Sequence, residues 1–381
     1  MVRGLWARGS TLPWGRVGAI ASVAGVAALG ITGTAFASMP AVAPGSVSVP
    51  VSASVPVSAS APAAVVVPAP RAALARPSYY IDCRRGSDQN SGSGRRPWRT
   101  PAVLNQRALP DRASVYLSRG CTWDGHVRIH GGSRILVAPY GQGNAPTITA
   151  RAAGKEQGAV VFASANGVIT GLRIAFTPGA GLTLAAPGAT AQQLRIERTA
   201  FGVRFTANGT VADRVSARDL HLFTSTPRWE NANDDSGAVG FNVEADDVVI
   251  RRSVCVRCRA ASSDYGHDGG FIEIWRKGDR LRAYHNVGYE TDGFLEIGGM
   301  RDRGDAINGV YLVGNRVSRA HGRAVYINQG GPYEIPVRNV VMRQNVIQVV
   351  RGDALAGQTW AIDMDRSNRV GPTVAPPVRP M

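Results

Sequence analysis

From about residue 160 onward, apolar and polar residues alternate in short segments that glycine, asparagine and aspartate separate. Two kinds of segment recur along this part of the chain. The first kind comprises residues 181–186, 202–207, 240–245, 270–275, 293–298 and 323–328, and the second comprises 194–199, 248–253, 281–286, 310–315 and 340–345. Alternation with a period of two predicts half-buried β-strands, and no segment has the 3.6-residue apolar period of a long helix.

Asparagine occupies one position of the second kind of segment three times in succession. Asn286, Asn315 and Asn345 follow one another at nearly equal intervals, and Ser253 takes the same place one repeat earlier. Asparagine tolerates the left-handed backbone of a tight corner, and its amide can hydrogen-bond to a copy above or below it. Two or three short strands in every period of roughly 20 to 38 residues, without helices, predict a β-solenoid.

The segment 79–123 begins the folded part of the chain. It reads as a strand, a Gly/Ser-rich loop, a tryptophan, a short helix and a strand followed by Arg-Gly-Cys-Thr-Trp. This segment is similar to the N-terminal cap of exported β-helix polysaccharide enzymes, where Arg-Gly-Asp-Thr-Trp is common. With the repeats, it makes residues 78–370 resemble the right-handed parallel β-helix superfamily, pectate-lyase-like in the broad sense. The resemblance implies an all-β, right-handed parallel β-helix, with Trp98 and Trp123 covering its open end.

The N-terminal segment 1–37 has the pattern of an export signal. Arg3, Arg8 and Arg16 accompany an apolar stretch at 19–31, and Ala-Phe-Ala at 35–37 reads as a cleavage site. This stretch is shorter than the roughly 20 residues of a membrane span. We therefore expect cleavage rather than an uncleaved anchor, and no stable membrane insertion afterwards.

A biased segment lies between the signal and the repeats. Residues 38–77 consist almost wholly of Ala, Val, Ser and Pro, and regular prolines block both helices and sheets. We expect a disordered stalk at 38–77, the β-helix at 78–370 and a disordered tail at 371–381. The expected product is a monomer that is secreted or displayed at the cell surface.

Charge adds a candidate partner. The formal net charge is +16, and loss of the signal with its three arginines would leave 16 − 3 = +13. Genomic base composition is one explanation of the arginine bias. The functional explanation is attraction to a polyanion, which we expect to be an acidic polysaccharide. The chain carries no zinc-finger, helix-turn-helix or RNP motif, so a nucleic acid is not expected.

Four cysteines in an exported chain are expected to form disulfides. Cys83 and Cys121 flank the start of the folded region and would staple it. Cys255 and Cys258 form a Cys-x-x-Cys motif without the second such motif of a zinc site, so a structural disulfide is expected. A redox role would need a thioredoxin-like βαβ context, which the sequence lacks.

Three glutamates interrupt apolar, strand-like segments. With Val243, Ile272 and Leu295 aligned as inward residues, the next residue in each segment points outward. The predicted outward column consists of Glu244, Glu273 and Glu296, followed by Tyr326. Strands in a sheet lie about 4.7–4.9 Å apart, so these carboxylates would repel one another. Arginines such as Arg204, Arg276 or Arg282, a calcium ion, or the protonation used in sugar chemistry would neutralise them.

Polar loops are expected to overhang this column. Residues 224–237 would supply Trp229 as a sugar-stacking platform, together with Asp234 and Asp235. Residues 261–270 would supply Tyr265, His267 and Asp268. We expect the substrate to contact Trp229, Tyr265, Arg276, His321 and Tyr326, whereas His285 is expected to be structural.

The first hypothesis for function is a secreted lyase that acts on an acidic, uronate-containing polysaccharide. Lyases with this fold often use Lys or Arg as the base, which Lys277 would supply, and Asn-Val-Glu at 242–244 is similar to a calcium-binding element of some alginate-lyase-like proteins. Glu244, Glu273 and Glu296 are then candidate calcium ligands. The candidate catalytic residues are these three with His267, Asp268 and Lys277. Two alternatives stay open: a glycoside hydrolase that uses the paired glutamates, and a non-catalytic protein that binds a surface or wall polysaccharide.

Overall fold

The computed structural model describes residues 76–231, 234–299, 304–328, 335–350 and 352–372. The predicted signal at 1–37, all but the last two residues of the stalk, and residues 373–381 of the tail lie outside the described residues. Within the described part, no helix is long and apolar enough to cross a membrane.

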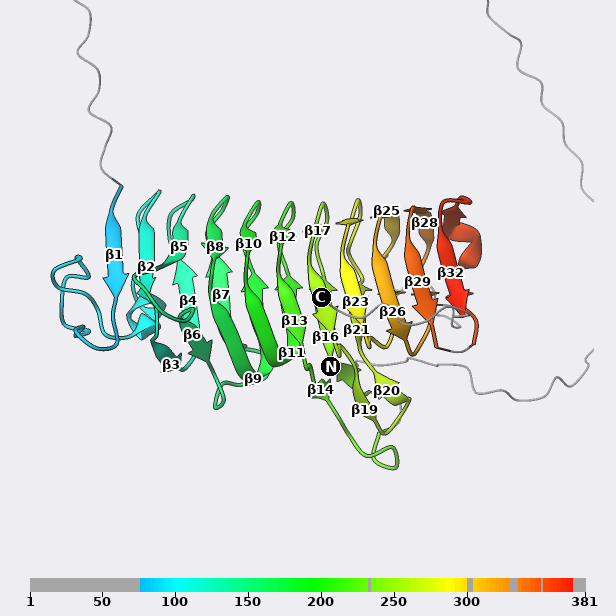
Figure 1. Cartoon of the computed structure of the whole chain (residues 1–381), viewed down its shortest axis with the longest axis horizontal. Helices are drawn as coiled ribbons and strands as arrows, with labels where there is room; N and C mark the ends of the chain where they lie inside the picture. Colours follow the sequence, from blue (N-terminus) through cyan, green and yellow to red (C-terminus); the bar gives the residue numbers. More distant parts are fainter. Residues whose placement is uncertain (1–75, 232–233, 300–303, 329–334, 351, 373–381) are drawn as a thin grey trace, which may run out of the picture. The chain divides into compact units, whose positions relative to one another are not determined.

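One face of the molecule is a sheet of eleven parallel strands (Figure 1). From β2 onward, each strand pairs with strands of adjacent repeats and not with the next strand in sequence, whereas β1 pairs directly with β2. In spatial order the strands are β1 (Ser78–Ile81), β2 (Ser114–Ser118), β5 (Leu136–Tyr140), β8 (Val168–Thr170), β10 (Thr190–Gln192), β12 (Val211–Asp213), β17 (Val249–Arg251), β22 (Arg282–Tyr284), β25 (Ile307–Val313), β28 (Val337–Arg343) and β31 (Ile362–Met364).

Two further parallel runs form the other faces, and the long strands β9 and β11 belong to both. The second run contains β3 (Thr122–Asp124), β6 (Thr147–Thr149), β9 (Arg173–Leu184), β11 (Arg195–Phe205), β13 (Ser216–Arg218), β18 (Val254–Val256), β23 (Val287–Tyr289), β26 (Arg316–Ala320), β29 (Val346–Val349) and β32 (Arg369–Pro372). The third run contains β4 (Val127–His130), β7 (Val160–Ala163), β9, β11, β16 (Val239–Val243), β21 (Gly270–Trp275), β24 (Leu295–Gly298), β27 (Val325–Ile327) and β30 (Leu355–Gly357).

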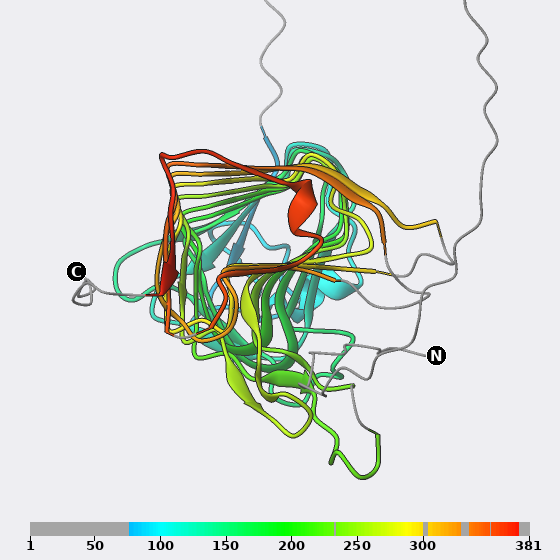
Figure 2. The same cartoon turned by 90° about the vertical axis from the view of Figure 1, so that its right-hand side faces the viewer.

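The chain therefore winds as a coil whose turns stack on one another, as the view along the stack shows (Figure 2). The turns differ in length, because Thr190 pairs with Val211 and Val211 pairs in turn with the more distant Val249. The predicted all-β, right-handed parallel β-helix is confirmed. One repeat alignment was wrong: within 194–199, residues 195–197 belong to the second run, against Ser216–Arg218, and not to the first sheet with 248–253.

Long turns carry insertions on one side of the coil. Two antiparallel hairpins project there, one made of β14 (Leu222–Thr224) and β15 (Ser236–Gly237), the other of β19 (Ala260–Ser262) and β20 (Gly266–Asp268) (Figure 1). Short 3-10 helices occur at η1 (Pro101–Asn105) and η4 (Thr359–Ala361). The first of these is the short helix expected in the cap.

Inward side chains fill the coil with one apolar core. Phe241, Phe271 and Phe294 are fully buried on successive turns, with ring centroids 5.4 and 5.5 Å apart. Gly240 lies beside this stack, and a Cβ placed on it would come within 2.3 Å of the Cys255 sulfur. Gly240 thus leaves room for the Cys255 side chain of β18 and for the backbone of Phe271 on the next turn.

The predicted asparagine ladder is confirmed. The Oδ1 of Asn315 accepts the backbone N–H of Asn286 at 3.0 Å and its side-chain amide at 2.9 Å, and Asn345 does the same for Asn315. Ser253 donates its backbone N–H to Asn286, as its predicted place requires. Asn368 extends the ladder by one turn, which the sequence alignment missed.

The residue before each ladder position forms the corner. His285 has φ of +53°, and Arg252 and Gln344 take the same left-handed conformation on other turns. The backbone N–H of His285 bonds to the carbonyl of Val313 on the next turn. His285 is therefore a corner residue, as expected.

The N-terminal cap covers the open edge of β1. Backbone bonds link Tyr80 to Gly92 and Trp98, so the cap loop pairs the edge that the first strand would otherwise expose. Trp98 is fully buried and stacks on Tyr79, and Trp123 is 7% exposed. Trp98 thus lies in the cap as expected, whereas Trp123 lies on β3 of the coil and donates its Nε1–H to the Arg99 carbonyl of the cap.

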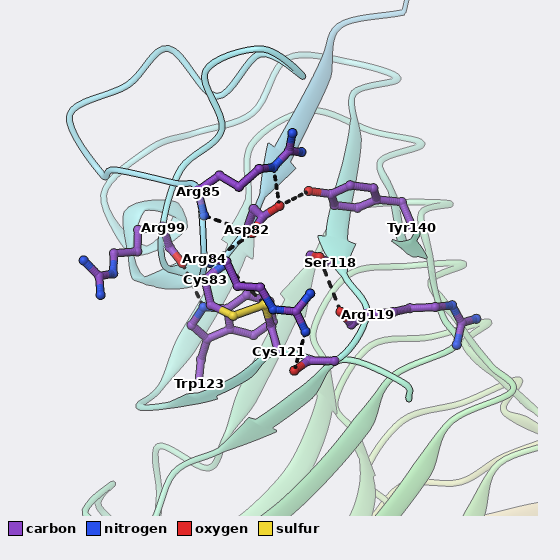
Figure 3. The surroundings of a disulfide bond; sticks show 11 residues. Asp82, Cys83, Arg84, Arg85, Arg99, Ser118, Arg119, Cys121, Trp123 and Tyr140 are labelled. Atoms are coloured by element: carbon purple, nitrogen blue, oxygen red, sulfur yellow. Dashed lines mark hydrogen bonds and ion pairs between the residues drawn. A yellow bond between two sulfur atoms is a disulfide. The ribbon is translucent and has the colours of Figure 1, made fainter. Parts of the chain in front are cut away.

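Both predicted disulfides are present, Cys83–Cys121 in the cap and Cys255–Cys258 in the core. Figure 3 shows the first, beside Asp82. The Asp82 carboxylate accepts hydrogen bonds from Arg85 at 2.9 Å and from Tyr140 at 3.1 Å. The disulfide and these bonds tie the cap loop to the first turns of the coil.

Candidate functional site

An outward row of polar residues crosses the third run of strands. In register from turn to turn it contains Arg204, Asn242, Glu273, Glu296 and Tyr326. Their neighbours in sequence, such as Ile272 and Leu295, are buried in the core. The prediction that these residues point outward is confirmed. The pairing of Glu273 with Glu296 and the place of Tyr326 on the next turn are confirmed as well.

The predicted place of Glu244 was wrong. Asn242, and not Glu244, lies opposite Glu273, because Phe241 rather than Val243 pairs with Ile272. A shift of two residues leaves every side chain on the same face of the strand, so alternation alone cannot choose between the two registers.

Arg204 neutralises Glu244 from the preceding turn. Its guanidinium donates two hydrogen bonds to the Glu244 carboxylate, Nε at 2.7 Å and Nη2 at 3.0 Å. This is the arginine pairing that the sequence offered as one of three ways to neutralise the column. It leaves Glu273 and Glu296 as the adjacent acidic pair.

Glu273 holds its proton unusually tightly. Burial is the largest cause that raises its pKa well above the usual value, followed by the negative charges of Glu296, Asp268 and Glu244. A hydrogen bond from the Asn242 side chain acts in the opposite direction and is outweighed. This environment therefore favours the protonated form of Glu273 over a wider pH range than that of an exposed glutamate.

Two adjoining hollows open at this acidic pair. The larger has a volume of about 270 Å³ and is lined by Asp292, Glu296, His321, Arg323, Tyr326 and Asp353, among others. The smaller lies under the hairpins and brings Asp235, Tyr265 and Asp268 to Glu273 and Glu296. Glu296 belongs to both hollows, so the glutamate pair stands at their junction.

The insertions fix the roof of the smaller hollow. Asp235 is 1% exposed and ties the two hairpins together, since it accepts the Thr226 N–H at 2.8 Å and the Ser262 hydroxyl at 2.7 Å. Burial raises the pKa of Asp235, but hydrogen bonds from Ser262 and from backbone N–H groups outweigh it and hold the pKa below its usual value. Asp235 therefore acts as a charged clamp between loops.

A divalent cation needs oxygen ligands that are not already engaged. Among the described residues, the one close group of three possible ligands is Asp234, Asp235 and Asp264. Asp235 and Asp264 there accept hydrogen bonds that hold the hairpins, so the group is explained as a loop clamp. Of the predicted calcium ligands, Glu244 does not fit because Arg204 occupies it, and calcium on Glu273 and Glu296 is a hypothesis that competes with a proton on Glu273.

The other predicted site residues divide into two groups. The structure brings Tyr265, Asp268, His321 and Tyr326 to the hollows. Lys277, His267, Arg276 and Trp229 line neither hollow.

Each residue outside the hollows has a definite place. Lys277 is exposed in the turn after β21, and His267 is exposed on β20. Arg276 donates to Asp305 at 3.0 Å, and Trp229 is 82% exposed on the insertion between β14 and β15. The reason for the difference is local: residues near the strands keep the facing of the coil, whereas loop tips do not.

Several residues of the site were missed by sequence reasoning. Asn242 was noted only as part of Asn-Val-Glu at 242–244 and was not placed in the column, because Glu244 was aligned two residues out of register. Asp292, Arg323 and Asp353 come from short corners after the second run of strands and carry no motif. Their position two or three residues before a recurring strand is the signal that could have found them.

His321 contributes a second titratable group to the larger hollow. Burial is the largest cause that lowers its pKa, and the positive charge of Arg259 adds to it. The Nε2 atom lies 3.6 Å from Glu290 and makes no hydrogen bond. A neutral imidazole is therefore favoured near neutral pH.

No protein-family model matches the chain, and no curated protein sequence matches it. The pairing of its strands decides the architecture. The chain is a parallel β-helix protein. Solved structures with some likeness include a lacto-N-biosidase from Eubacterium ramulus, with a TM-score of 0.43, 11% identity, and coverage of 78% of this chain and 68% of that one.

Two lyase structures show a comparable likeness. Pectate lyase Pel9A gives a TM-score of 0.42 at 12% identity, over 77% of this chain and 79% of its own. An alginate lyase from Paenibacillus sp. str. FPU-7 gives 0.34 at 16%, over 71% of this chain and 97% of its own. At such identities the likeness concerns the fold, and the site of this parallel β-helix protein has to be judged from its own residues.

The acidic pair Glu273 and Glu296, which faces outward from the coil, is suited to acid–base chemistry. Glu273, whose pKa is raised, lines the smaller hollow beside Glu296 on the adjacent strand, and Glu296 also lines the larger hollow with the imidazole of His321 and the side chain of Tyr326. Pairs of titratable groups whose surroundings push their pKa values apart are suited to act as acid and base in one reaction.

Proposed function

We propose that this protein cleaves glycosidic bonds of a polysaccharide at the wall formed by Glu273 and Glu296. The observation that carries the proposal is the raised pKa of Glu273 next to a second carboxyl group. Adjacent strands lie about 4.7–4.9 Å apart, close to the separation of about 5–5.5 Å between the carboxyls of retaining glycosidases.

In the proposed reaction, protonated Glu273 donates its proton to the glycosidic oxygen as the bond to the sugar breaks. The Glu296 carboxylate attacks the anomeric carbon and forms a glycosyl ester. Water then attacks that carbon, Glu273 takes up a proton from the water, and Glu296 leaves as a carboxylate. Both residues return to their starting states, so protons and bonds balance.

The charge of the hollows favours a substrate that is uncharged at the cleaved sugar. Asp268, Asp292 and Asp353 join the glutamate pair, whereas Arg323 is the one arginine among the described residues of both linings. A uronate would meet like charges here. The acidic lining is therefore the reason to place hydrolysis before β-elimination, which was the first hypothesis from the sequence.

A lyase is the second candidate, and one observation favours it. His321, Arg323 and Tyr326 line the same hollow. In β-elimination, Arg323 would neutralise the uronate carboxylate, neutral His321 would remove the C5 proton, and Tyr326 would protonate the leaving oxygen as a C4–C5 double bond forms.

Product analysis separates these reactions. The full chain is incubated with a panel of neutral and acidic polysaccharides, and reducing ends and ultraviolet absorbance are followed together. Hydrolysis releases reducing ends without absorbance, whereas elimination produces unsaturated, absorbing ends. Absorbing products would overturn hydrolysis and favour the lyase, and binding without any product would favour the third hypothesis, a non-catalytic binding protein.

Glu273→Gln tests the wall itself. We expect it to abolish product formation, because it keeps the shape of Glu273 and removes the transferable proton. Glu156→Gln is the matched control, since Glu156 is exposed and its ion pair with Arg204 is long, at 3.8 Å. Activity that survives Glu273→Gln at the control's level would place the chemistry elsewhere.

A further inference from the structure

A second charged region lies on an earlier turn, at the corner that follows the second run of strands. Phe176 has φ of +57° there, a conformation that bulky residues rarely adopt. The guanidinium carbons of Arg151, Arg198 and Arg173 lie 4.5, 4.9 and 5.9 Å from the centre of its ring. Three arginines thus gather on one partly exposed aromatic ring.

On later turns, the arginine at the same corner is paired with an acid. Arg257 pairs with Asp219 at 2.5 Å, and Arg319 pairs with Glu290 at 2.5 Å, so each arginine meets an acid from the turn before it. Arg198 occupies the equivalent corner, but the turn before it presents Phe176. The ring takes the place of the carboxylate on the preceding turn, and Asp219 at the corner of the following turn is paired with Arg257.

The surroundings add further positive charge. Arg173 and Arg195 face each other on β9 and β11, and both bond to the buried Glu197. Arg218 lies in register with Glu197 on the next strand, and its Nε is buried without a hydrogen-bond partner. Acids in contact with this group are Glu197 and Asp124, whose carboxylate accepts the backbone N–H of Arg151.

We name this group the Phe176 cluster: Phe176 with Arg151, Arg173, Arg195, Arg198 and Arg218. Its five arginines and the two neighbouring acids give a formal charge of 5 − 2 = +3. Arg151 and Arg198 are exposed and have no ion-pair partner among the residues that the structure describes. Like charges held together in this way favour an anion that bridges them.

We propose that the Phe176 cluster binds the carboxylate groups of an acidic polysaccharide. Guanidinium forks match carboxylates in geometry, and neighbouring strands repeat them along the coil at about 4.8 Å, which suits a chain that carries charges in a row. The cluster is separate from the acidic wall and lies on turns before β16. Binding there does not depend on the activity proposed for Glu273.

The ring itself argues against a single-stranded nucleic acid as the ligand. Such strands bind where bases stack on open aromatic faces interleaved with positive charge. Here guanidinium groups already pack against the one aromatic ring. The cluster therefore offers charge and no stacking platform.

Titration of the full chain with polygalacturonate tests the proposal. Dextran serves as an uncharged probe and a polythymidylate oligonucleotide as the nucleic-acid probe. We expect Arg151→Gln with Arg198→Gln to weaken polygalacturonate binding by about tenfold or more, because two charged hydrogen-bonding groups are lost. Arg95→Gln with Arg96→Gln removes two exposed arginines of the cap and is expected to change affinity less than about twofold.

Equal losses of polygalacturonate affinity in both double variants would show that binding depends only on net charge. That result would overturn the proposed site. Absence of polygalacturonate binding by the wild type would overturn it as well. Binding of the oligonucleotide at equal affinity, with the same loss in the cluster variant, would overturn the assignment to a polysaccharide. Unchanged melting curves confirm that the variants remain folded.

Discussion

The strand register that places Glu273 beside other acids affects both the stability and the proposed activity of the protein. It stands opposite Glu296 and near Asp268 on a wall where two carboxylates would repel each other. The proton that relieves this repulsion is also the proton that the proposed reaction transfers. Stability and activity should therefore respond to the same titration.

Glu273→Gln should flatten the dependence of stability on pH. Because the pKa of Glu273 is raised in the folded state, its contribution to the free energy of unfolding is present below the unfolded pKa, about 4.3, and is lost as pH rises through the folded-state pKa. We expect the melting temperature of the variant, relative to wild type, to rise as pH increases from the unfolded-state pKa through the folded-state pKa. A constant difference across that range would show that Glu273 does not titrate as proposed.

Calcium is the rival explanation for adjacent carboxylates at Glu273 and Glu296. We expect a chelator to leave the melting temperature unchanged, because Arg204 holds Glu244 and a proton neutralises Glu273. A fall that added calcium reverses would support the ion instead, since a ligand of the folded state stabilises by mass action.

The sequence predicted the glutamate pair and Tyr326 on the next turn, but not Asn242 on the preceding turn. Alternation identified the outward face of Glu273 and Glu296, because burial on one face imposes a period of two. It could not exclude a shift of two residues, so Glu244 was placed where Asn242 lies. Loop residues such as Trp229 follow no such period, and their positions depend on contacts that a single sequence does not reveal.

At the scale of one element, the asparagine ladder joins corners of successive turns. Asn315→Ala should cost on the order of 3 kcal/mol of unfolding free energy, because it leaves the buried N–H of Asn286 and the carbonyl of Ala283 without partners at about 1–3 kcal/mol each.

Denaturant unfolding measures this cost. Asn308→Ala is the control, since Asn308 is exposed, and we expect it to stay within about 0.5 kcal/mol of wild type. A ladder variant as stable as the control would mean that water replaces these bonds at no cost.

The repeats could be aligned correctly from sequence where polar residues recur at the corner. Asn286, Asn315 and Asn345 aligned correctly because a buried amide at a corner has few substitutes. Earlier turns place apolar Leu194 and Val215 at this position, and there the alignment of residues 194–199 was wrong. Apolar core residues replace one another freely, so they define the fold class without fixing the register.

On the scale of the whole described coil, charge of opposite sign occupies different turns. The acidic wall lies on β21 and β24, whereas the Phe176 cluster lies on β9, β11, β13 and the corner after β6. Salt screens exposed charges beyond about 10 Å at ~0.1 M. The two regions can therefore attract different parts of a polymer without cancelling each other.

The stacking of turns also sets how the molecule would respond to pulling. Each turn contacts mainly its two neighbours, so tension applied at the last strand would detach turns one after another. Turns of roughly 20 to 38 residues would each release about 70 to 140 Å of extended chain. The Cys83–Cys121 disulfide would carry the tension itself, so the residues between the two cysteines would not extend. A protein tethered by its N-terminal side to a surface would thus unravel from its free end, and its first turn would bear load only after reduction.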